Sequence, residues 1–355
     1  MTTQSSSRLD ELELERDEAD VTFWRQATPG TTYVRCLLPA RYLNGQCLGL
    51  ESWDLDWDHE LDRMVMTRQK GVSVWQFLGD DWRSRIAFAL QEQGVRVLME
   101  VDDNYTTPHP VWPGQKVAWH PTIREATRLG GSGYSNEMHR LLVPEMDGII
   151  VSTPYLRRTY LEYSDDVFLC PNTVDPVDWE DLEEKDPDVL RIVYSGSKSH
   201  MRDAPLVKKA LKWASRQPGV EVWLQGVGKD EWLFAHKHPW TVSLSEYRRT
   251  LGRFDVGVAP LIGGEWADGK SDLKALEYAM AGVLPLLSFE EPYRPWFDRL
   301  DYLVDSSEDA WLDRIKWVVK NRDAIPELVD RARTYVLNER TTEANAWRWR
   351  KALDV

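Results

Sequence analysis

The sequence predicts an α/β fold built from two doubly wound parallel sheets and closed by C-terminal helices. Three observations carry this prediction. Short apolar runs rich in β-branched residues alternate with helical patterns in both halves of the chain. The 355 residues, 42% of them hydrophobic, exceed what a single core usually organises. A stretch of prolines and acidic residues without periodicity, from Pro171 to Asp188, separates the two halves.

In the first half, four apolar runs are long enough and apolar enough to form buried strands. They cover residues 32–40, 72–78, 95–101 and 148–153. The first twenty residues are polar and acidic instead. We therefore expect an acidic N-terminal segment over 1–28, a first Rossmann-like domain over 29–172 and a linker over 173–188.

The alternation restarts after the linker. Strands are expected at 190–196, 220–226, 255–261 and 283–289, and helices at 203–217, 245–253 and 271–281. Beyond Ser307 the pattern is helical to the end of the chain. We expect a second domain over 189–335 and a last helix, over 336–355, that packs back on the first domain.

Charge and cysteine usage exclude several classes of protein. The formal net charge is -14, from 58 acidic and 44 basic side chains, so the overall field repels nucleic acid. The three cysteines form neither a C-x-x-C pair nor a cluster at zinc spacing. No signal peptide or run of about 18 apolar residues is present. These features predict a cytoplasmic protein without a membrane span, a structural metal or a nucleic-acid partner.

Residues 264–271, GEWADGKS, satisfy the G-x-x-x-x-G-K-[ST] pattern of a phosphate-binding P-loop. In such a loop the backbone would wrap a triphosphate and Ser271 would hold Mg²⁺. The pattern is short, and the strand that a P-loop NTPase needs for its metal-binding aspartate has only a crude candidate ending near Ser288. A P-loop NTPase is therefore one alternative for this stretch.

The helix expected after this loop separates an apolar stripe from a charged face. The stripe consists of Leu273, Leu276 and Met280. The other face carries Lys270, Lys274 and Glu277. Two ammonium groups at a helix N-terminus favour a bound phosphate, and a carboxylate one turn further can accept two ribose hydroxyls. A solvent-exposed charged face is the alternative on spacing alone.

The continuation KSDLKALEYAMAGVLPLLS resembles the donor-nucleotide helix of GT-B fold glycosyltransferases, in particular family 4 (glycosyl transferases group 1) and related phage-encoded enzymes. Their pattern is a strand ending D-x-G-x-A-P-L, a loop, K-S-x-x-K-x-x-E-Y-x-A, and then G-x-P-x-x-x-S. Here it spans Asp255–Leu261, Lys270–Ala279 and Gly282–Ser288. The resemblance implies two Rossmann-like domains facing a cleft, with Ser271 beside the lysines in the donor site.

A second segment, YSGSKSHMRD, resembles the first strand-to-helix loop of the donor domain in that family. The likeness implies that the backbone of Gly196 and Ser197 approaches the donor diphosphate. The side chains that would reach it are Lys198, His200 and Arg202. For the histidine, a helix cap or a packing role is an equal alternative.

Two segments of the first half resemble the acceptor domain of that family, VSTPYLRRTY followed by PNTVD at its end and RVLMEVDDNY at a strand end. RVLMEVDDNY places Asp102 and Asp103 at a strand end, where an acid–base or acceptor-orienting role is a candidate and solvated turn carboxylates are the alternative. The loop ARYLNGQ, expected after the first strand, offers Arg41, Asn44 and Gly45 to close the donor site, or else forms an ordinary turn.

One departure from the family pattern stands out. Many family 4 enzymes carry two glutamates eight positions apart, but the position eight before Glu277 is Gly269, and Glu265 lies in the loop. The detailed sugar contacts therefore do not follow from the resemblance.

The resemblance implies a hexosyltransferase-type enzyme that moves a sugar from a nucleotide diphosphate sugar to an acceptor. Retention of configuration, no metal and no cofactor are implied as well. The acceptor, a glycan, a protein or a small molecule, is left open. A non-catalytic GT-B scaffold or binding protein is the second alternative.

Overall fold

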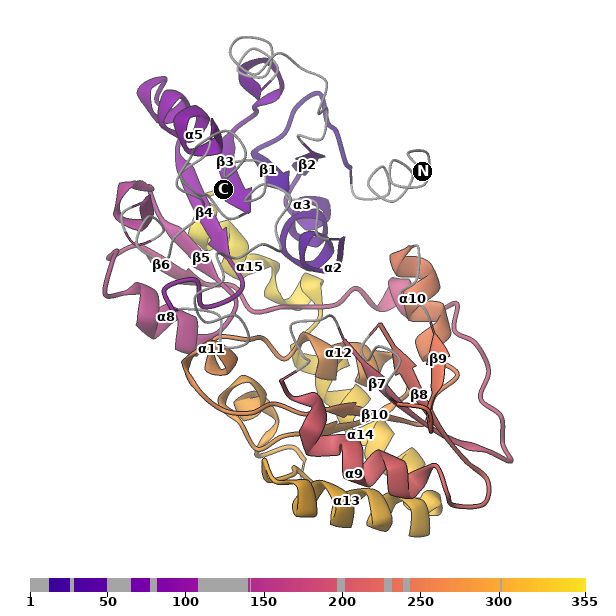
Figure 1. Ribbon diagram of the computed structural model, residues 1–355. Helices are drawn as coiled ribbons and strands as arrows, with labels where there is room; N and C mark the ends of the chain where they lie inside the picture. The colour runs from indigo at the N-terminus through magenta and orange to yellow at the C-terminus, as the bar shows by residue number, and fades with distance from the viewer. Residues whose placement is uncertain are drawn as a thin grey trace. The chain divides into compact units, whose positions relative to one another are not determined.

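The computed structural model describes residues 13–25, 29–49, 65–76, 82–107, 140, 142–196, 202–226, 232–238, 243–300 and 302–355. Two compact units divide the chain. One combines Met1–Asn172 with Asn345–Val355, and the other is Thr173–Ala344. Each unit contains one parallel sheet covered by helices (Figure 1).

The first unit is built on a six-stranded parallel sheet in the order β2-β1-β3-β4-β5-β6. The strands are β1 (Val21–Arg25), β2 (Gly45–Gly49), β3 (Val72–Gln76), β4 (Val97–Val101), β5 (Ile149–Val151) and β6 (Val167–Leu169). Its helices include α5 (Trp82–Glu92), the 3₁₀ turn η2 (Val143–Glu145), α8 (Pro154–Tyr160) and most of α15 (Thr342–Leu353). The strands are almost entirely buried, as expected for a parallel sheet with both faces covered.

The strand expected at 32–40 is wrong. This segment is helical and consists of α2 (Pro29–Thr32), the π-helix η1 (Tyr33–Leu37) and α3 (Leu38–Tyr42). All five residues of η1 are buried, Arg35 among them, and a run that is buried on every side cannot be assigned to helix or strand by periodicity. The first strand is β1, which lies inside the segment 1–28 that we expected to precede the domain.

The C-terminal helix α15 packs on the first unit. The indole of Trp349 meets the ring of Phe23 edge-on, with 5.7 Å between ring centroids. Arg350 donates a hydrogen bond to the Tyr42 carbonyl at 3.0 Å. Residues from both ends of the chain therefore share one core.

The second unit has a five-stranded parallel sheet in the order β11-β10-β7-β8-β9. Its strands are β7 (Leu190–Ser195), β8 (Val220–Gln225), β9 (His236–His238), β10 (Val256–Ala259) and β11 (Leu284–Leu287). The helices are α9 (Ala204–Ala214), α10 (Leu244–Leu251), α11 (Glu265–Asp268), α12 (Leu273–Met280), α13 (Glu308–Lys320) and α14 (Ile325–Glu339). The 3₁₀ turns are η3 (Pro176–Trp179), η5 (Glu291–Trp296) and η6 (Arg322–Ala324).

Most elements expected in the second half are present. The strands predicted from 190, 220, 255 and 283 correspond to β7, β8, β10 and β11, and the helical stretches correspond to α9, α10 and α12–α14. The sequence did not reveal β9, whose three residues, HKH, lack an apolar pattern, or the four-residue helix α11.

One close contact fixes α12 on the second sheet. Gly257 of β10 lies directly under the ring of Tyr278, where an added Cβ would stand 2.5 Å from the nearest ring carbon. The Tyr278 hydroxyl accepts a hydrogen bond from the Ser195 N–H at 3.3 Å. The helix is therefore held against both β10 and the carboxyl end of β7.

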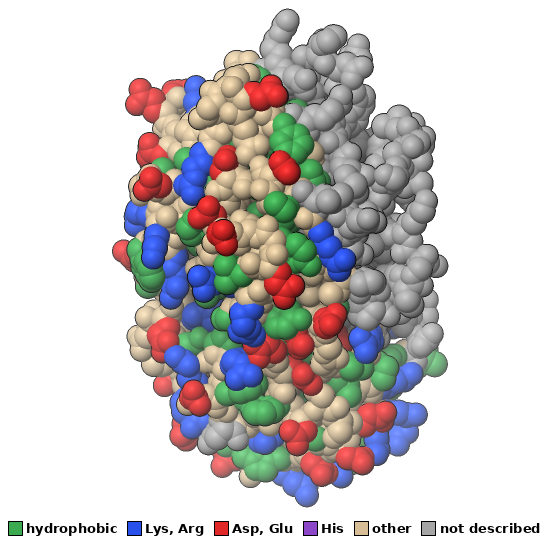
Figure 2. All heavy atoms as spheres, turned by 90° about the vertical axis from the view of Figure 1, so that its left-hand side faces the viewer, with side chains coloured by type: hydrophobic (Ala, Val, Ile, Leu, Met, Phe, Trp, Pro, Cys, Tyr) green, Lys and Arg blue, Asp and Glu red, His purple; other side chains and the backbone are tan. Residues whose placement is uncertain are grey.

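Acidic and basic side chains are interspersed over the described part of the face in Figure 2. Among the described residues, no helix has both the length and the apolar character that crossing a membrane requires.

We expect Gly257→Ala to destabilise the second unit by about 1–3 kcal/mol, because the new methyl group would overlap the Tyr278 ring. Thermal and urea unfolding would measure the loss. Gly30→Ala is the control, since a Cβ at Gly30 would have no atom within 4 Å. Equal stability of the wild type and Gly257→Ala would contradict the assigned contact.

Candidate functional site

The candidate site lies at the carboxyl ends of the strands in the second unit. Helix α12 buries Ala275, Leu276 and Met280 and leaves Lys274 and Glu277 half-buried on its other side. Of the expected stripe, Leu276 and Met280 are buried, whereas Leu273 is only half-buried at the start of the helix. In open α/β sheets, ligands bind at the carboxyl ends of the strands, which makes this polar side of α12 the place to examine.

Glu277 and Lys274 share one partner, the phenol of Tyr247 on α10. The Tyr247 hydroxyl donates to Glu277 Oε2 at 2.9 Å. The Lys274 ammonium lies 3.3 Å from the same hydroxyl and 3.6 Å from Glu277 Oε2. Burial raises the pKa of Tyr247 well above its usual value, and the Glu277 carboxylate adds to this effect. The phenol therefore remains a donor, and among the described residues nothing engages Glu277 Oε1.

Lys270 lies before α12, not on it. The Lys270 N–H donates to the Ala267 carbonyl at 3.0 Å, which closes the short helix α11, and α12 begins only at Leu273. The Lys270 ammonium lies 5.6 Å from the centroid of the Trp266 ring. Lys270 thus lies over the Trp266 ring and Lys274 over the Tyr247 ring. Because Lys270 is not part of α12, the two lysines are not related by the helical spacing that we expected. Ser271 is half-buried between the two helices.

The segment 264–271 does not have the conformation of a P-loop. Its middle residues form α11, and the Asp268 N–H donates to the Gly264 carbonyl at 2.9 Å. Backbone N–H groups that already have carbonyl partners cannot line a phosphate cradle. Gly264 has φ +132°, which only glycine adopts readily. An alanine there would be strained whether or not a phosphate binds.

The ends of β7 and β8 bring further polar groups to this side of the sheet. Ser195 pairs with Gln225 in the register of the two strands, and the Gly196 N–H donates to the Gln225 carbonyl at 3.1 Å. The Ser195 hydroxyl and both amide atoms of Gln225 are buried and have no hydrogen-bond partner among the residues that the structure describes. Buried polar groups in this condition usually require water or a ligand. Each is the last residue of an apolar strand, and no motif of the sequence indicates that the two lie together.

Three residues of the expected donor loop, Ser197, Lys198 and His200, lie outside the described residues. Arg202, the next candidate, is exposed just before α9. Asp203 accepts a hydrogen bond from the Ile262 N–H at 2.9 Å. The start of α9 is therefore tied to the loop that follows β10.

The loop between β10 and α12 carries a group of acidic residues. The pKa of Asp268 is raised by partial burial and by the nearby carboxylate of Glu290. Glu265 is the first residue of α11, and Gly269 ends that helix. The position eight before Glu277 is thus Gly269, and the nearest glutamate before it in the chain, Glu265, lies at the other end of α11.

In the first unit, Asp102 and Asp103 follow β4 and are half-buried. The Tyr105 hydroxyl donates to Asp102 Oδ1 at 3.0 Å, and the Ser152 hydroxyl donates to the Asp102 carbonyl at 3.3 Å. Asp103 accepts the Tyr105 N–H through its carbonyl. These contacts fix the turn, and their geometry fits the turn interpretation as well as an acceptor-orienting role.

Beside this turn, Glu100 on β4 forms a fully buried ion pair with Arg35 of η1 at 2.6 Å. Arg35 also donates to the Cys170 carbonyl and to Asn172 Oδ1, and its guanidinium lies 5.0 Å from the centroid of the Trp349 ring. Burial raises the pKa of Glu100 to about 7, although Arg35 opposes this effect. The sequence does not predict a role for Arg35, because the run around it predicts a buried strand.

Arg41, Asn44 and Gly45 do not form a loop after the first strand. Arg41 lies in the last turn of helix α3 and donates to the Tyr33 hydroxyl at 3.1 Å. Asn44 takes a left-handed turn with φ +50°, and Gly45 begins β2. A Cβ at Gly45 would stand 2.8 Å from Val21 Cγ1, so close strand packing explains this glycine. Residues 26–28, which follow β1, lie outside the described residues.

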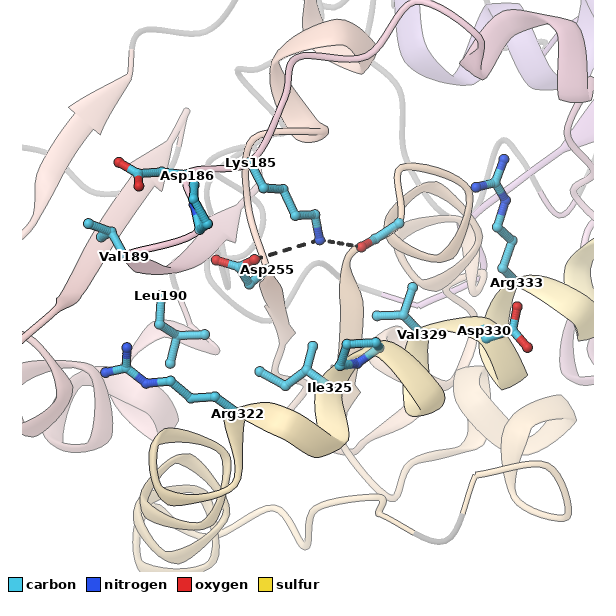
Figure 3. A pocket seen from close by; sticks show the side chains of 13 residues that line it. Lys185, Asp186, Val189, Leu190, Asp255, Arg322, Ile325, Val329, Asp330 and Arg333 are labelled. Atoms are coloured by element: carbon cyan, nitrogen blue, oxygen red, sulfur yellow. Dashed lines mark hydrogen bonds and ion pairs between the residues drawn. The ribbon is translucent and has the colours of Figure 1, made fainter.

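A pocket of about 510 Å³ opens at the other, amino-terminal ends of the second sheet (Figure 3). There the Lys185 ammonium donates to the Gly282 carbonyl at 2.6 Å and lies 3.7 Å from Asp255 Oδ1. The charges of Lys185 and Asp255 therefore compensate each other. The pocket lies at the opposite ends of the strands from the candidate site. Within the described ranges, no group of three or more His, Cys, Asp or Glu side chains can hold a metal ion.

Comparisons of sequence find no match, neither to a family model nor to a characterised protein. Comparisons of structure find many. TarM from S. aureus, in a complex that contains UDP, is 14% identical with a TM-score of 0.55. That match covers 80% of this chain, which spans only 55% of the TarM chain.

Two other solved structures match along nearly their whole length. HepE from Anabaena, in complex with UDP and glucose, is 9% identical with a TM-score of 0.62, covering 95% of this chain and 100% of its own. The trehalose-6-phosphate synthase OtsA is 10% identical with a TM-score of 0.64, covering 95% and 99%. A further structure of that synthase comes from a study of glycosyltransfer with retention. Together with the two parallel sheets, these matches confirm the predicted α/β fold of the GT-B type.

The buried Glu100 predicts a pH-dependent stability. A pKa raised from 4.5 to about 7 means that the folded state binds the proton more tightly, so the carboxyl group contributes stability below pH 4.5 that is lost as the pH rises through 7. At ~1.4 kcal/mol per pKa unit the loss is about 3 kcal/mol. Glu100→Gln should remove this dependence in urea unfolding between pH 4.5 and 7.5. An identical pH profile in the wild type and the variant would contradict it.

Proposed function

We propose that this protein is a glycosyltransferase that moves a sugar from a nucleotide diphosphate sugar to an acceptor. The observation that carries the proposal is the cluster of Lys274, Glu277 and Tyr247 beside the carboxyl end of β7. The similar structures TarM, HepE and OtsA are supporting context, because HepE and TarM were solved with UDP. The likeness in fold alone would not carry a function.

The chemistry of each group suits one part of such a donor. The free Oε1 of Glu277 can accept hydrogen bonds from ribose hydroxyls while Tyr247 holds Oε2. The ammonium groups of Lys270 and Lys274 supply positive charge for a diphosphate. The first N–H groups of α12 have no partner within their helix and add to that field.

In this proposal the rate enhancement comes from stabilising the departing diphosphate, which gains negative charge as the glycosidic bond breaks. The first unit would position the acceptor, with Asp102 and Asp103 as the candidate orienting groups. Retention of configuration is favoured by the likeness to trehalose-6-phosphate synthase. Metal independence is proposed because lysines and a helix terminus can replace Mg²⁺, and activity that persists in EDTA would test this point.

We expect Glu277→Ala to weaken binding of the nucleotide sugar and of the free nucleoside diphosphate alike, by roughly 1–3 kcal/mol, because charged hydrogen bonds to ribose are lost. Isothermal titration calorimetry would measure both. Glu246→Ala on α10 is a matched control, since Glu246 is exposed one residue before Tyr247. Unchanged affinity in a folded Glu277→Ala variant would remove the ribose assignment.

We expect Lys270→Ala and Lys274→Ala each to reduce sugar transfer at least ~tenfold, because both lose charge beside the diphosphate. Donor turnover and ATP hydrolysis should be measured in parallel, with Lys316→Ala on α13 as the control. A protein that hydrolyses ATP and tolerates Lys274→Ala would instead be a P-loop NTPase. Donor binding with no turnover under any acceptor condition would favour a non-catalytic binding protein.

A further inference from the structure

Asp272, inside the candidate donor segment, is held by three donors. Arg340 contacts its carboxylate with two nitrogens, Nη1 to Oδ2 at 2.5 Å and Nη2 to Oδ1 at 2.8 Å. The indole Nε1 of Trp296 donates to Oδ2 at 2.9 Å. Both charged residues are buried, with 5% of Asp272 and 8% of Arg340 exposed. A two-nitrogen contact of this kind is strong and fixed in direction.

The direction of the Asp272 side chain is unusual for its place in the chain. Asp272 is the N-cap residue of α12, where an aspartate normally accepts hydrogen bonds from the first N–H groups of the helix. Here its side chain makes no capping bond, because the carboxylate is turned to Arg340 and Trp296. The N–H groups at the start of α12 therefore have no carboxylate of their own.

The charge of Asp272 conflicts with its neighbours. It lies two residues from Lys270 and two from Lys274, the side chains that would meet a diphosphate. An uncompensated carboxylate at this position would cancel part of their field and repel the anion. Arg340 removes the conflict in two ways, since it neutralises the carboxylate and keeps it away from the helix terminus.

Arg340 is itself held in place. Its Nη1 also donates to the Tyr335 hydroxyl at 3.1 Å, and its carbonyl accepts a hydrogen bond from the Val174 N–H at 3.0 Å. Arg340 follows α14 directly and so reaches Asp272 from an element 68 residues away in the chain. No motif of the sequence links these two positions.

We propose that Arg340 is a positioning residue for the diphosphate of the donor. It withdraws and neutralises the Asp272 carboxylate, so that this charge does not oppose the positive field of Lys270, Lys274 and the start of α12. This inference rests on the proposed function, because it assigns a new residue to the same site. Arg340 does not touch the ligand and acts only through Asp272.

The test is a charge-rescue experiment. Calorimetry first identifies which of UDP, GDP, ADP, CDP and dTDP the wild type binds most tightly. With that nucleotide, Arg340→Met should weaken binding at least ~tenfold, because Asp272 then faces the diphosphate unneutralised. Asp272→Asn combined with Arg340→Met should recover affinity to within ~threefold, because the asparagine carries no charge. The loss in the single variant should shrink with added salt.

Arg299→Met is the matched control. The Arg299 guanidinium stacks on the Tyr335 ring at 4.2 Å and pairs with Glu339 at 2.6 Å, so its loss affects the same helix without touching Asp272. It should lower the melting temperature but leave nucleotide affinity unchanged.

Three outcomes would overturn the inference. Arg340→Met that binds as tightly as the wild type would show that the neutralisation is irrelevant. A folded double variant that binds as poorly as Arg340→Met would assign Arg340 a structural role only. If the wild type binds none of the five nucleotides, the proposed function itself fails, and the inference falls with it.

Discussion

The contact between Tyr278 and Gly257 determines where helix α12 lies, and the candidate site depends on that placement. The ring occupies the space that any side chain at residue 257 would fill. Its hydroxyl also receives the N–H of Ser195 at the end of β7, so the helix is fixed by packing and by a hydrogen bond at once. Because Glu277 is the next residue before Tyr278, this constraint also sets where the carboxylate meets Tyr247.

The charged side chains of the two units have different environments. In the second unit, Glu277 is only half-buried and keeps one oxygen available, which suits a group that binds a ligand. In the first unit, Glu100 and Arg35 are fully buried and bind each other. A buried pair loses hydration that its mutual attraction repays only in part, so it is better suited to fixing η1 against β4 than to meeting a substrate.

The sequence predicted the second unit more accurately than the first for an identifiable reason. Strands such as β7 and β10 are short apolar runs bounded by glycine, proline or aspartate, and the helices between them have clear amphipathic periods. The run at 32–40 is largely apolar apart from Thr32 and Arg35 and has no clear period, so a buried helix and a buried strand have the same pattern. The residues of the candidate site were predictable to the same extent, namely where a local pattern relates them. Lys274 and Glu277 share a helix and could be paired by spacing, whereas Tyr247, Gln225 and Arg340 are brought there only by tertiary packing.

Arg340 also connects the candidate site to the segments where the chain passes between the two units. The chain leaves the first unit after Asn172 and returns to it at Asn345. Near these points Val174 pairs with Thr341 as a parallel bridge, and the hydroxyls of Thr173 and Thr342 are 3.0 Å apart. The Arg340 carbonyl belongs to this bridge through Val174, while its guanidinium holds Asp272 at the start of α12.

One residue thus joins the two crossing segments by its backbone and the candidate donor segment by its side chain. Removing one member of a buried ion pair typically costs about 3–5 kcal/mol, so a rearrangement of the crossing segments that pulled Arg340 from Asp272 would be strongly opposed. A rearrangement that kept the pair would have to carry the start of α12 with it. The conformation of the crossing segments and the field at the start of α12 are therefore physically coupled through a single guanidinium.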